Sequence, residues 1–212
     1  MLIGLVGLIG SGKDTVANRM VTHHGFVRDS FAKSLKDAVS NIFGWDRKLL
    51  EGNTKESRLW REKTDKFWSE KFNKEITPRE ILQYFGTEVC RGNMLDTIWV
   101  DSCMARYKGQ STVISDTRFI NEIKTIKKNG GKIILIKRGE LPSKQEMKSK
   151  GIHQSEWDWF DESFDYVIEN NGTLEDLNDN VDKTINSISH RVGRFTIKEI
   201  VDATNDLLRD HR

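Results

Sequence analysis

Residues 2–15 read LIGLVGLIGSGKDT, and this stretch decides the fold of the chain. Its first five residues are almost continuously apolar, which is typical of a short parallel strand buried on both faces. Gly7, Gly12 and Lys13 then supply the pattern G-x-x-x-x-G-K, and residues 14–24 contain no Gly or Pro and predict a helix. This order of strand, glycine-rich loop and helix is the context that a phosphate-binding loop requires.

The chemistry of such a loop explains its spacing. A loop with few side chains can turn successive backbone N–H groups toward phosphate oxygens, at the positive end of the helix that follows. Lys13 adds a full positive charge that can reach the β- and γ-phosphates of a nucleotide. We therefore expect the phosphates of a nucleotide to bind where the first strand ends.

Asp14 departs from the usual form of this loop. It stands where most phosphate loops carry the Ser or Thr that binds magnesium, and Thr15 follows it. Two interpretations of Asp14 stay open at this point. Its carboxylate could hold magnesium directly or through water, or it could simply cap the start of the helix.

Length and composition indicate a soluble globular protein. With 212 residues, 36% apolar and 31% charged, we expect one domain with embellishments, or at most two small ones. The 34 basic and 32 acidic residues nearly balance, which argues against binding of nucleic-acid polymers. No apolar run reaches membrane-spanning length and no basic leader precedes the first strand, so we expect a cytoplasmic protein without a membrane partner. Cys90 and Cys103 lack the spacing of a zinc or redox pair, and we expect reduced, packed thiols.

The rest of the chain alternates apolar runs with helical patterns. The runs at 26–31, 112–115, 132–137 and 166–168 predict four further strands, and amphipathic stripes between them predict helices. Strands that alternate with helices require a parallel sheet covered on both faces. The fold class is therefore α/β, with a five-stranded parallel sheet.

Two charged residues mark the same edge of this sheet. Asp116 comes directly after the run 112–115, and Arg138 comes directly after the run 132–137. The carboxyl ends of parallel strands meet at one edge, which is where doubly wound folds bind their ligands. We therefore expect both side chains to share a crevice with the phosphate loop.

Residues 77–80, Thr-Pro-Arg-Glu, carry the signature of a helix start. In the helix that follows, Arg79, Gln83 and Gly86 share a face that is separate from the apolar one. A glycine inside a helix costs about 1 kcal/mol relative to alanine. We therefore expect a ligand or another stretch of backbone to come close to Gly86.

Three segments lie outside the regular alternation. Residues 45–75 are rich in charge and contain three tryptophans, and they form either a cover over the site, which would exclude water from phosphoryl transfer, or a surface appendage. Residues 139–162 are polar and lid-like. Residues 189–212 predict an amphipathic C-terminal helix beyond a domain of residues 1–188, and its apolar face must pack on that domain or on a second subunit in a homodimer.

Several segments together resemble one family. They are GLIGSGKDT (7–15), FAKSLKDA (31–38), TPREILQYFGTEVCR (77–91), DTIWVD (96–101), VISDTRFINEI (113–123) and DYVIENNGTLEDL (165–177). They resemble the deoxynucleoside monophosphate kinases of tailed bacteriophages, within the wider P-loop nucleoside monophosphate kinase fold of three layers. The resemblance implies transfer of the γ-phosphoryl group of ATP to a deoxynucleoside monophosphate, with magnesium, for the synthesis of deoxynucleoside triphosphates. It is weakest over 45–75 and absent from 189–212.

The resemblance also implies site residues by position. The ATP-binding set is Ile9, Gly10, Ser11, Gly12, Lys13, Asp14 and Thr15, with Asp14 as the metal residue. The acceptor-binding set is Lys36, Arg79, Gln83, Gly86, Thr87, Trp99, Asp116, Arg118 and Glu122. The catalytic set is Lys13, Asp116, Arg118 and Arg138.

Two other functions stay open from the sequence. The chain could be a P-loop kinase of another small acceptor, such as dephospho-coenzyme A. It could also be a nucleotide-binding module that no longer transfers phosphate, although Lys13, Asp116, Arg118 and Arg138 argue against this. The bases accepted, the preference between ribose and deoxyribose, and the oligomeric state are not decided by the sequence.

Overall fold

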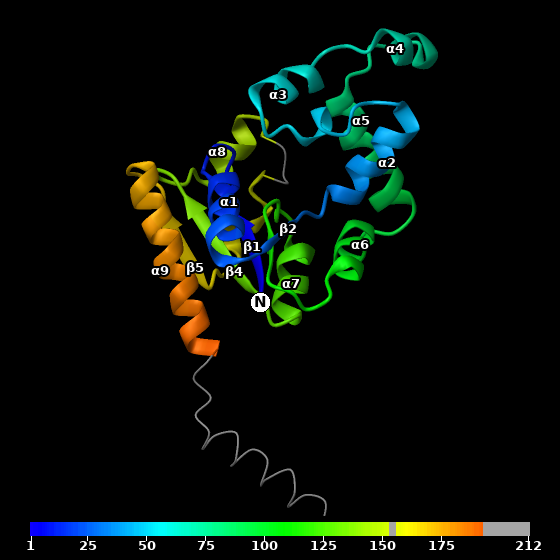
Figure 1. Cartoon of the computed structure of the whole chain (residues 1–212). Helices are drawn as coiled ribbons and strands as arrows, with labels where there is room; N and C mark the ends of the chain where they lie inside the picture. The colour runs from blue at the N-terminus through cyan, green and yellow to red at the C-terminus, as the bar shows by residue number, and fades with distance from the viewer. Residues whose placement is uncertain (153–155, 193–212) are drawn as a thin grey trace, which may run out of the picture.

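A computed structural model describes residues 1–152 and 156–192 of the chain (Figure 1). Five strands form one sheet in the order β2-β3-β1-β4-β5, and every neighbouring pair is parallel. The strands are β1 (Leu2–Val6), β2 (Val27–Asp29), β3 (Thr112–Ile114), β4 (Lys132–Lys137) and β5 (Tyr166–Glu169). The predicted α/β fold with a five-stranded parallel sheet is confirmed.

Helices connect the strands and cover both faces of the sheet, which gives three layers. Between β1 and β3 lie α1 (Lys13–His24), α2 (Lys33–Phe43), η1 (Leu49–Glu51), α3 (Lys55–Arg61), α4 (Lys66–Phe72), α5 (Pro78–Tyr84), η2 (Phe85–Gly92) and α6 (Ile98–Arg106). After β3 follow α7 (Ile120–Lys128), α8 (Lys144–Ser149), η4 (Asp158–Asp161) and α9 (Leu174–Val192). Among the described helices, none is long and apolar enough to cross a membrane.

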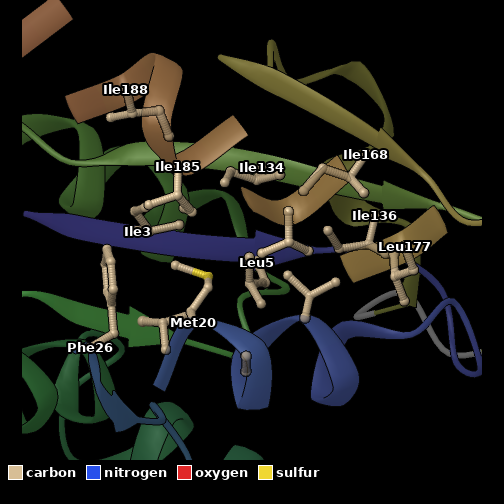
Figure 2. Packing of buried hydrophobic residues seen from close by; sticks show 14 residues of the cluster. Ile3, Leu5, Met20, Phe26, Ile134, Ile136, Ile168, Leu177, Ile185 and Ile188 are labelled. Atoms are coloured by element: carbon tan, nitrogen blue, oxygen red, sulfur yellow. The ribbon is translucent and has the colours of Figure 1, made fainter. Parts of the chain in front are cut away.

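The first face of the sheet packs against α1 and α9. Figure 2 shows Ile3 of β1 and Ile134 of β4 directed toward Met20 of α1 and Ile185 of α9. All four side chains are buried in one cluster, which also holds Ile168 of β5. The apolar stripe of α9 therefore closes one side of the sheet, beside the phosphate loop.

The other face packs against α6 and α7. Val100 and Cys103 of α6 and Ile123 of α7 are buried there, together with Trp159 from η4. Cys103 and Cys90 are both free and buried, as expected, and burial raises the pKa of the Cys103 thiol to about 12. Because Trp159 belongs to this core, the second half of the segment 139–162 is anchored to the body.

The inserted segment, residues 45–75, has a small aromatic core of its own. Trp45 stacks on Phe43 at 4.7 Å between ring centroids, and Trp68 meets Phe43 edge-on at 4.8 Å. The Trp45 indole N–H donates to Asp65 at 2.8 Å, and Trp45 is buried with Ile81 of α5. The tryptophans therefore hold the inserted segment onto α2 and α5.

Helix α5 begins as predicted and continues differently. Thr77 and Glu80 form the expected capping box, but after Tyr84 the chain continues as the π-helix η2, and the next helix begins at Ile98. Gly86 is buried, and a Cβ placed there would lie 2.8 Å from Leu35 of α2. The close neighbour that was expected at Gly86 is therefore a packed side chain.

The C-terminal region is described only in part. Helix α9 passes through the expected boundary at residue 188 and extends to Val192. The expected helix of the tail lies outside the described residues, because the description ends at residue 192.

The interior position of β4, between β1 and β5, leads to a prediction about stability. Ile134 is fully buried in the sheet, whereas Val27 is exposed on the edge strand β2. Ile134→Ala should lower the free energy of unfolding by about 2–5 kcal/mol, because it removes buried methyl groups and leaves a cavity. Val27→Ala should cost less than about 1 kcal/mol. Urea unfolding of both variants measures the difference, and equal losses would contradict the assignment of this core.

Candidate active site

The phosphate loop connects β1 to α1 and is held by backbone contacts. The Ser11 N–H donates to the Leu8 carbonyl at 3.1 Å, and the Lys13 ammonium donates to the Gly7 carbonyl at 2.6 Å and the Leu8 carbonyl at 2.9 Å. Gly12 has a φ of +103°, and a Cβ there would lie 2.5 Å from the side-chain nitrogen of Asn170. Only glycine adopts this positive φ readily and also leaves the space that a Cβ would fill.

A cleft of about 440 Å³ opens in front of this loop. Gly10, Gly12, Lys13, Asp14 and Thr15 line it, as predicted for the ATP-binding set. Two members of that set do not line it, since the Ile9 side chain points into solvent and Ser11 is buried.

Other walls of the cleft come from distant parts of the chain. Arg138, which follows β4, lines it as expected, and Asn170, which follows β5, lines it as well. The Asn170 amide donates to the Ser11 carbonyl at 2.8 Å, and the strand-end rule that identified Asp116 could have found this residue. Asn53 and Arg58 of the inserted segment complete the wall, and nothing in the sequence pattern singled them out.

Asp14 pairs with an arginine that the sequence did not single out. Its carboxylate accepts from Arg28 of β2, and Arg28 also donates to Ser115 and to Asn18, both at 3.1 Å. The Asp14 side chain is 64% exposed, and no side-chain cap hydrogen bond is present at the start of α1. The interpretation of Asp14 as a helix cap is therefore wrong for this structure.

Asp116 lies at the carboxyl end of β3 and organises the neighbouring backbone. Its two oxygens accept the N–H groups of Phe31 at 2.9 Å and Ala32 at 3.0 Å, directly before α2. Burial lowers the pKa of Lys13, and the negative charge of Asp116 is one of those that oppose this shift. The structure therefore brings Asp116 to the edge where the sequence placed it, with both oxygens engaged.

Glu122 lies behind the turn that carries Arg118. It is 3% exposed, and one oxygen accepts the N–H groups of Arg118 at 2.7 Å and Phe119 at 3.0 Å. The other accepts from Arg91 at 2.9 Å, and the Arg91 guanidinium stacks on the Phe119 ring at 4.2 Å. Burial, followed by the charge of Asp116, raises the pKa of Glu122 to about 7. Direct contact of Glu122 with the acceptor stays a prediction, because in this structure both of its oxygens accept hydrogen bonds from the protein.

The predicted cations on the acceptor side are held by carboxylates from separate segments. Arg118 pairs with Glu156. Arg79 pairs with Glu62 at 2.7 Å, and Lys36 pairs with Glu51 at 2.7 Å. These three cations extend from the sheet edge toward the inserted segment.

The remaining acceptor-side residues have different surroundings. Gln83 and Thr87 are exposed, and Thr87 borders a second cavity of about 520 Å³ together with Arg91 and Phe119. Trp99 is 7% exposed, and its indole N–H donates to the Gly86 carbonyl at 2.9 Å. Direct contact of Trp99 or Gly86 with an acceptor stays a prediction, because the structure packs both of them into the core.

Arg118 also acts on Lys13 across the site. Burial, and next the positive charge of Arg118, lowers the pKa of Lys13 from 10.5 to about 8, while Glu156, Asp14 and Asp116 partly oppose this. Because burial and a neighbouring cation both disfavour the charged ammonium, an anion placed between Lys13 and Arg118 would be bound strongly.

The lowered pKa of Lys13 predicts that ATP binding takes up protons. At pH 8 about half of the Lys13 side chains are neutral in the free protein, and the phosphates of ATP should restore the charge. The ATP phosphates themselves contribute little, because the second pKa of a phosphate is about 6. Calorimetry at pH 8 in two buffers of different ionisation enthalpy measures the uptake, and uptake that persists in Lys13→Met would contradict this origin.

The lowered pKa of Lys13 also predicts the direction in which the free energy of unfolding changes with pH. Lys13 has a lower pKa in the folded state than its ordinary value of 10.5, so between pH 8 and 10.5 the unfolded chain binds more protons. The contribution of this group to the free energy of unfolding should therefore rise with pH across that window. Urea unfolding of the wild type and of Lys13→Met isolates the contribution.

Comparison with known proteins relates this chain to one family of kinases. The family model for deoxynucleotide monophosphate kinase matches residues 46–181. A putative deoxynucleotide monophosphate kinase of Acanthamoeba polyphaga mimivirus is 32% identical over 198 residues, which cover 84% of this chain and 92% of that protein. A deoxynucleoside-5'-monophosphate kinase of Escherichia phage T5 is 29% identical over 209 residues, covering 74% of this chain and 84% of that protein. A solved dephospho-CoA kinase from Campylobacter jejuni has 18% identity and a TM-score of 0.43, covering 89% of this chain and 97% of that chain.

The stretch matched by the family model is more than half of the chain. It begins in the inserted segment, ends within α9, and includes Arg79, Arg118 and Arg138. The similarity to the mimivirus protein covers most of both chains. The resemblance inferred from the sequence is confirmed, and this chain belongs to the deoxynucleotide monophosphate kinase family.

Proposed function

We propose that this chain transfers the γ-phosphoryl group of ATP to the phosphate of a deoxynucleoside monophosphate at the carboxyl edge of its sheet. By family the chain is a deoxynucleoside monophosphate kinase, with ATP as the phosphoryl donor. The position of Arg118 is the observation that best supports this assignment of the site. Its charge acts on Lys13 of the phosphate loop and also on Arg61 of the inserted segment. A phosphoryl group that passes from donor to acceptor would pass beside this guanidinium.

The reaction requires charge neutralisation more than a base. An oxygen of the acceptor's phosphate attacks the γ-phosphorus, the bond to the oxygen that bridges the β- and γ-phosphorus breaks, and ADP leaves with that electron pair. The attacking oxygen is already ionised, so no proton has to be removed. Asp116 fits this scheme as a residue that positions the start of α2, because its oxygens already accept two backbone N–H groups.

The cations divide by position. Lys13, the loop N–H groups and Arg138 serve the ATP phosphates, since they line the cleft in front of the loop. Lys36 and Arg79 serve the acceptor's phosphate, and Arg118 serves the phosphoryl group in transfer. Guanidinium groups suit this task because they bind phosphate oxygens in pairs and keep their proton. Glu122 holds the backbone of Arg118 in place.

The residues at the cleft also fit magnesium. Asp14 offers an exposed carboxylate beside the Thr15 hydroxyl, and magnesium usually takes one or two carboxylates together with substrate phosphates. We assign Asp14, with Thr15, to hold the ion or its water shell. The ion supplies positive charge at the β- and γ-oxygens when it is bound. Asp14 pairs with Arg28 in this structure, so it has to release Arg28 before it can bind the ion.

Further assignments are proposals as well. Residues 1–188 form the kinase domain, residues 45–75 cover the site, and residues 139–162 act as a lid. The places of Asn53 and Arg58 in the cleft support the cover, and the pair between Arg118 and Glu156 supports the lid. A homodimer through residues 189–212 and a cytoplasmic location stay predictions from the sequence.

An acceptor panel tests the function. ADP release should appear with at least one of dAMP, dCMP, dGMP and dTMP, and should be absent with dephospho-coenzyme A. Lys13→Met should lower kcat by about 100-fold or more, because the ammonium stabilises charge that develops in the transition state. Lys128→Met, an exposed lysine on α7, is the matched control and should leave kcat unchanged. Near-normal turnover by a folded Lys13→Met would contradict the site, and turnover of dephospho-coenzyme A alone would contradict the acceptor.

A second experiment tests the role of Asp14. Adding magnesium should tighten ATP binding to the wild type, and in Asp14→Asn this gain should shrink by about 10-fold, since a charged ligand is lost. Arg28→Gln frees the carboxylate and should keep the gain. The gain is the ratio of the calorimetric dissociation constants for ATP without and with magnesium. The same gain in wild type and Asp14→Asn would show that Asp14 does not bind the metal.

A further inference from the structure

Arg61 ends α3 in the inserted segment and has no counterion among the residues that the structure describes. Its Nε atom is buried and has no hydrogen-bond partner. An arginine that is partly withdrawn from water without a partner is costly, because the lost hydration is not replaced. Proteins rarely leave such groups unsatisfied, so this one requires an explanation.

The carboxylates nearest to Arg61 are engaged elsewhere. Glu62, the next residue, pairs with Arg79 at 2.7 Å. Glu51 pairs with Lys36 at 2.7 Å and also with Arg47. Both act on Arg61 only through their longer-range field. Within residues 1–152 and 156–192, pairing therefore does not satisfy Arg61.

Arg61 faces the site rather than open solvent. Arg58 lies one helical turn before it on α3, hence on the same side of the helix, and Arg58 lines the cleft of the phosphate loop. Arg79 and Arg118 lie close enough that, after burial, their charges lower the pKa of Arg61. Arg79 also pairs with Glu62, the neighbour of Arg61 in the sequence, so α3 and α5 bring these two arginines to the same part of the inserted segment.

Gly52 shapes the position of Arg61. Its φ is +68°, and a Cβ placed on it would lie 2.0 Å from one terminal nitrogen of Arg61 and 2.2 Å from the guanidinium carbon. The guanidinium plane thus rests against a backbone that carries no side chain. This contact keeps the Arg61 head group on the side of Arg79 and Arg118.

We propose that Arg61 binds the phosphate of the acceptor monophosphate together with Arg79 and Arg118. The inference rests on the proposed function and adds a residue that neither the sequence nor the family resemblance singled out. A phosphate monoester carries close to two negative charges at neutral pH. It supplies the hydrogen-bond acceptors that Arg61 lacks and relieves the repulsion among the three guanidinium groups. The inserted segment then closes over the acceptor because its own arginine holds the ligand.

Binding and stability measurements on Arg61→Met test the proposal. Calorimetric titration with each of dAMP, dCMP, dGMP and dTMP should show acceptor affinity about 10- to 100-fold weaker than in the wild type. Affinity for ATP should change less than about 2-fold, since Arg61 is assigned to the acceptor alone. The ligand-free variant should melt at or above the wild-type temperature, because an unpartnered charge has been removed from a partly buried site. Lys55→Met, which removes an exposed charge from the same helix, is the control and should bind like the wild type.

A pair of glycine variants distinguishes displacement of the Arg61 guanidinium from a general loss of stability. Gly52→Ala displaces the guanidinium, and Gly44→Ala imposes the same backbone strain at the same φ of +68° with nothing within 4 Å of the added methyl. Both should lose similar stability, but only Gly52→Ala should weaken binding of the monophosphates.

The outcomes separate this inference from the proposed function. Wild-type affinity for the monophosphates in Arg61→Met, a loss confined to ATP, or a lower melting temperature with unchanged binding would each overturn the role of Arg61. If the wild type itself binds none of the four monophosphates, the proposed function fails, and this inference fails with it.

Discussion

Repulsion among cations collected at one edge of the sheet is the constraint on which the rest of the site depends. Burial, and next the charge of Arg118, lowers the pKa of Lys13, and burial, and next the charge of Arg79, lowers the pKa of Arg61, with Arg118 contributing as well. Like charges brought together in a partly dehydrated place are costly at short range. A kinase of nucleotides needs this arrangement, because a triphosphate and a monophosphate bring several negative charges into one crevice. The unfavourable field of the free protein therefore becomes favourable when both substrates are bound.

The protein moderates this repulsion with carboxylates from separate segments, one largely buried and one exposed. Glu156 pairs with Arg118, and Glu62 pairs with Arg79. The Arg79–Glu62 pair is exposed on both sides and contributes little, because water screens it and long side chains lose freedom to form it. A phosphate that offers two oxygens to one guanidinium can replace such a partner. The carboxylates thus hold the cations near the site, and a phosphate can still replace them as partners.

Two further carboxylates, the half-buried Asp116 and the buried Glu122, have a different role. Asp116 accepts backbone N–H groups from the start of α2, and Glu122 accepts those of the turn that carries Arg118. Hydrogen bonds from backbone to carboxylate are short and strong, and they determine the position of the chain rather than of a mobile side chain. The distance between the phosphate loop and the acceptor side therefore rests on these two residues. The sequence placed both of them near the site but did not distinguish a supporting role from direct contact.

The sequence by itself determined the parallel sheet and the phosphate loop. Strands buried on both faces read as continuous apolar runs, so Lys132–Lys137 was found with its observed bounds, and the strand-end rule placed Asp116 and Arg138. Tertiary structure alone decided the place of the inserted segment, because its tryptophans pack on α2 and α5 without any local period. The tertiary structure also decided which cations at the site are already paired with a carboxylate. Arg28, which pairs with a carboxylate 14 residues away, looks like Arg61 in a sequence, although Arg61 has no hydrogen-bond partner for its Nε atom in the described part of the chain. Only the folded chain shows which carboxylates are already engaged.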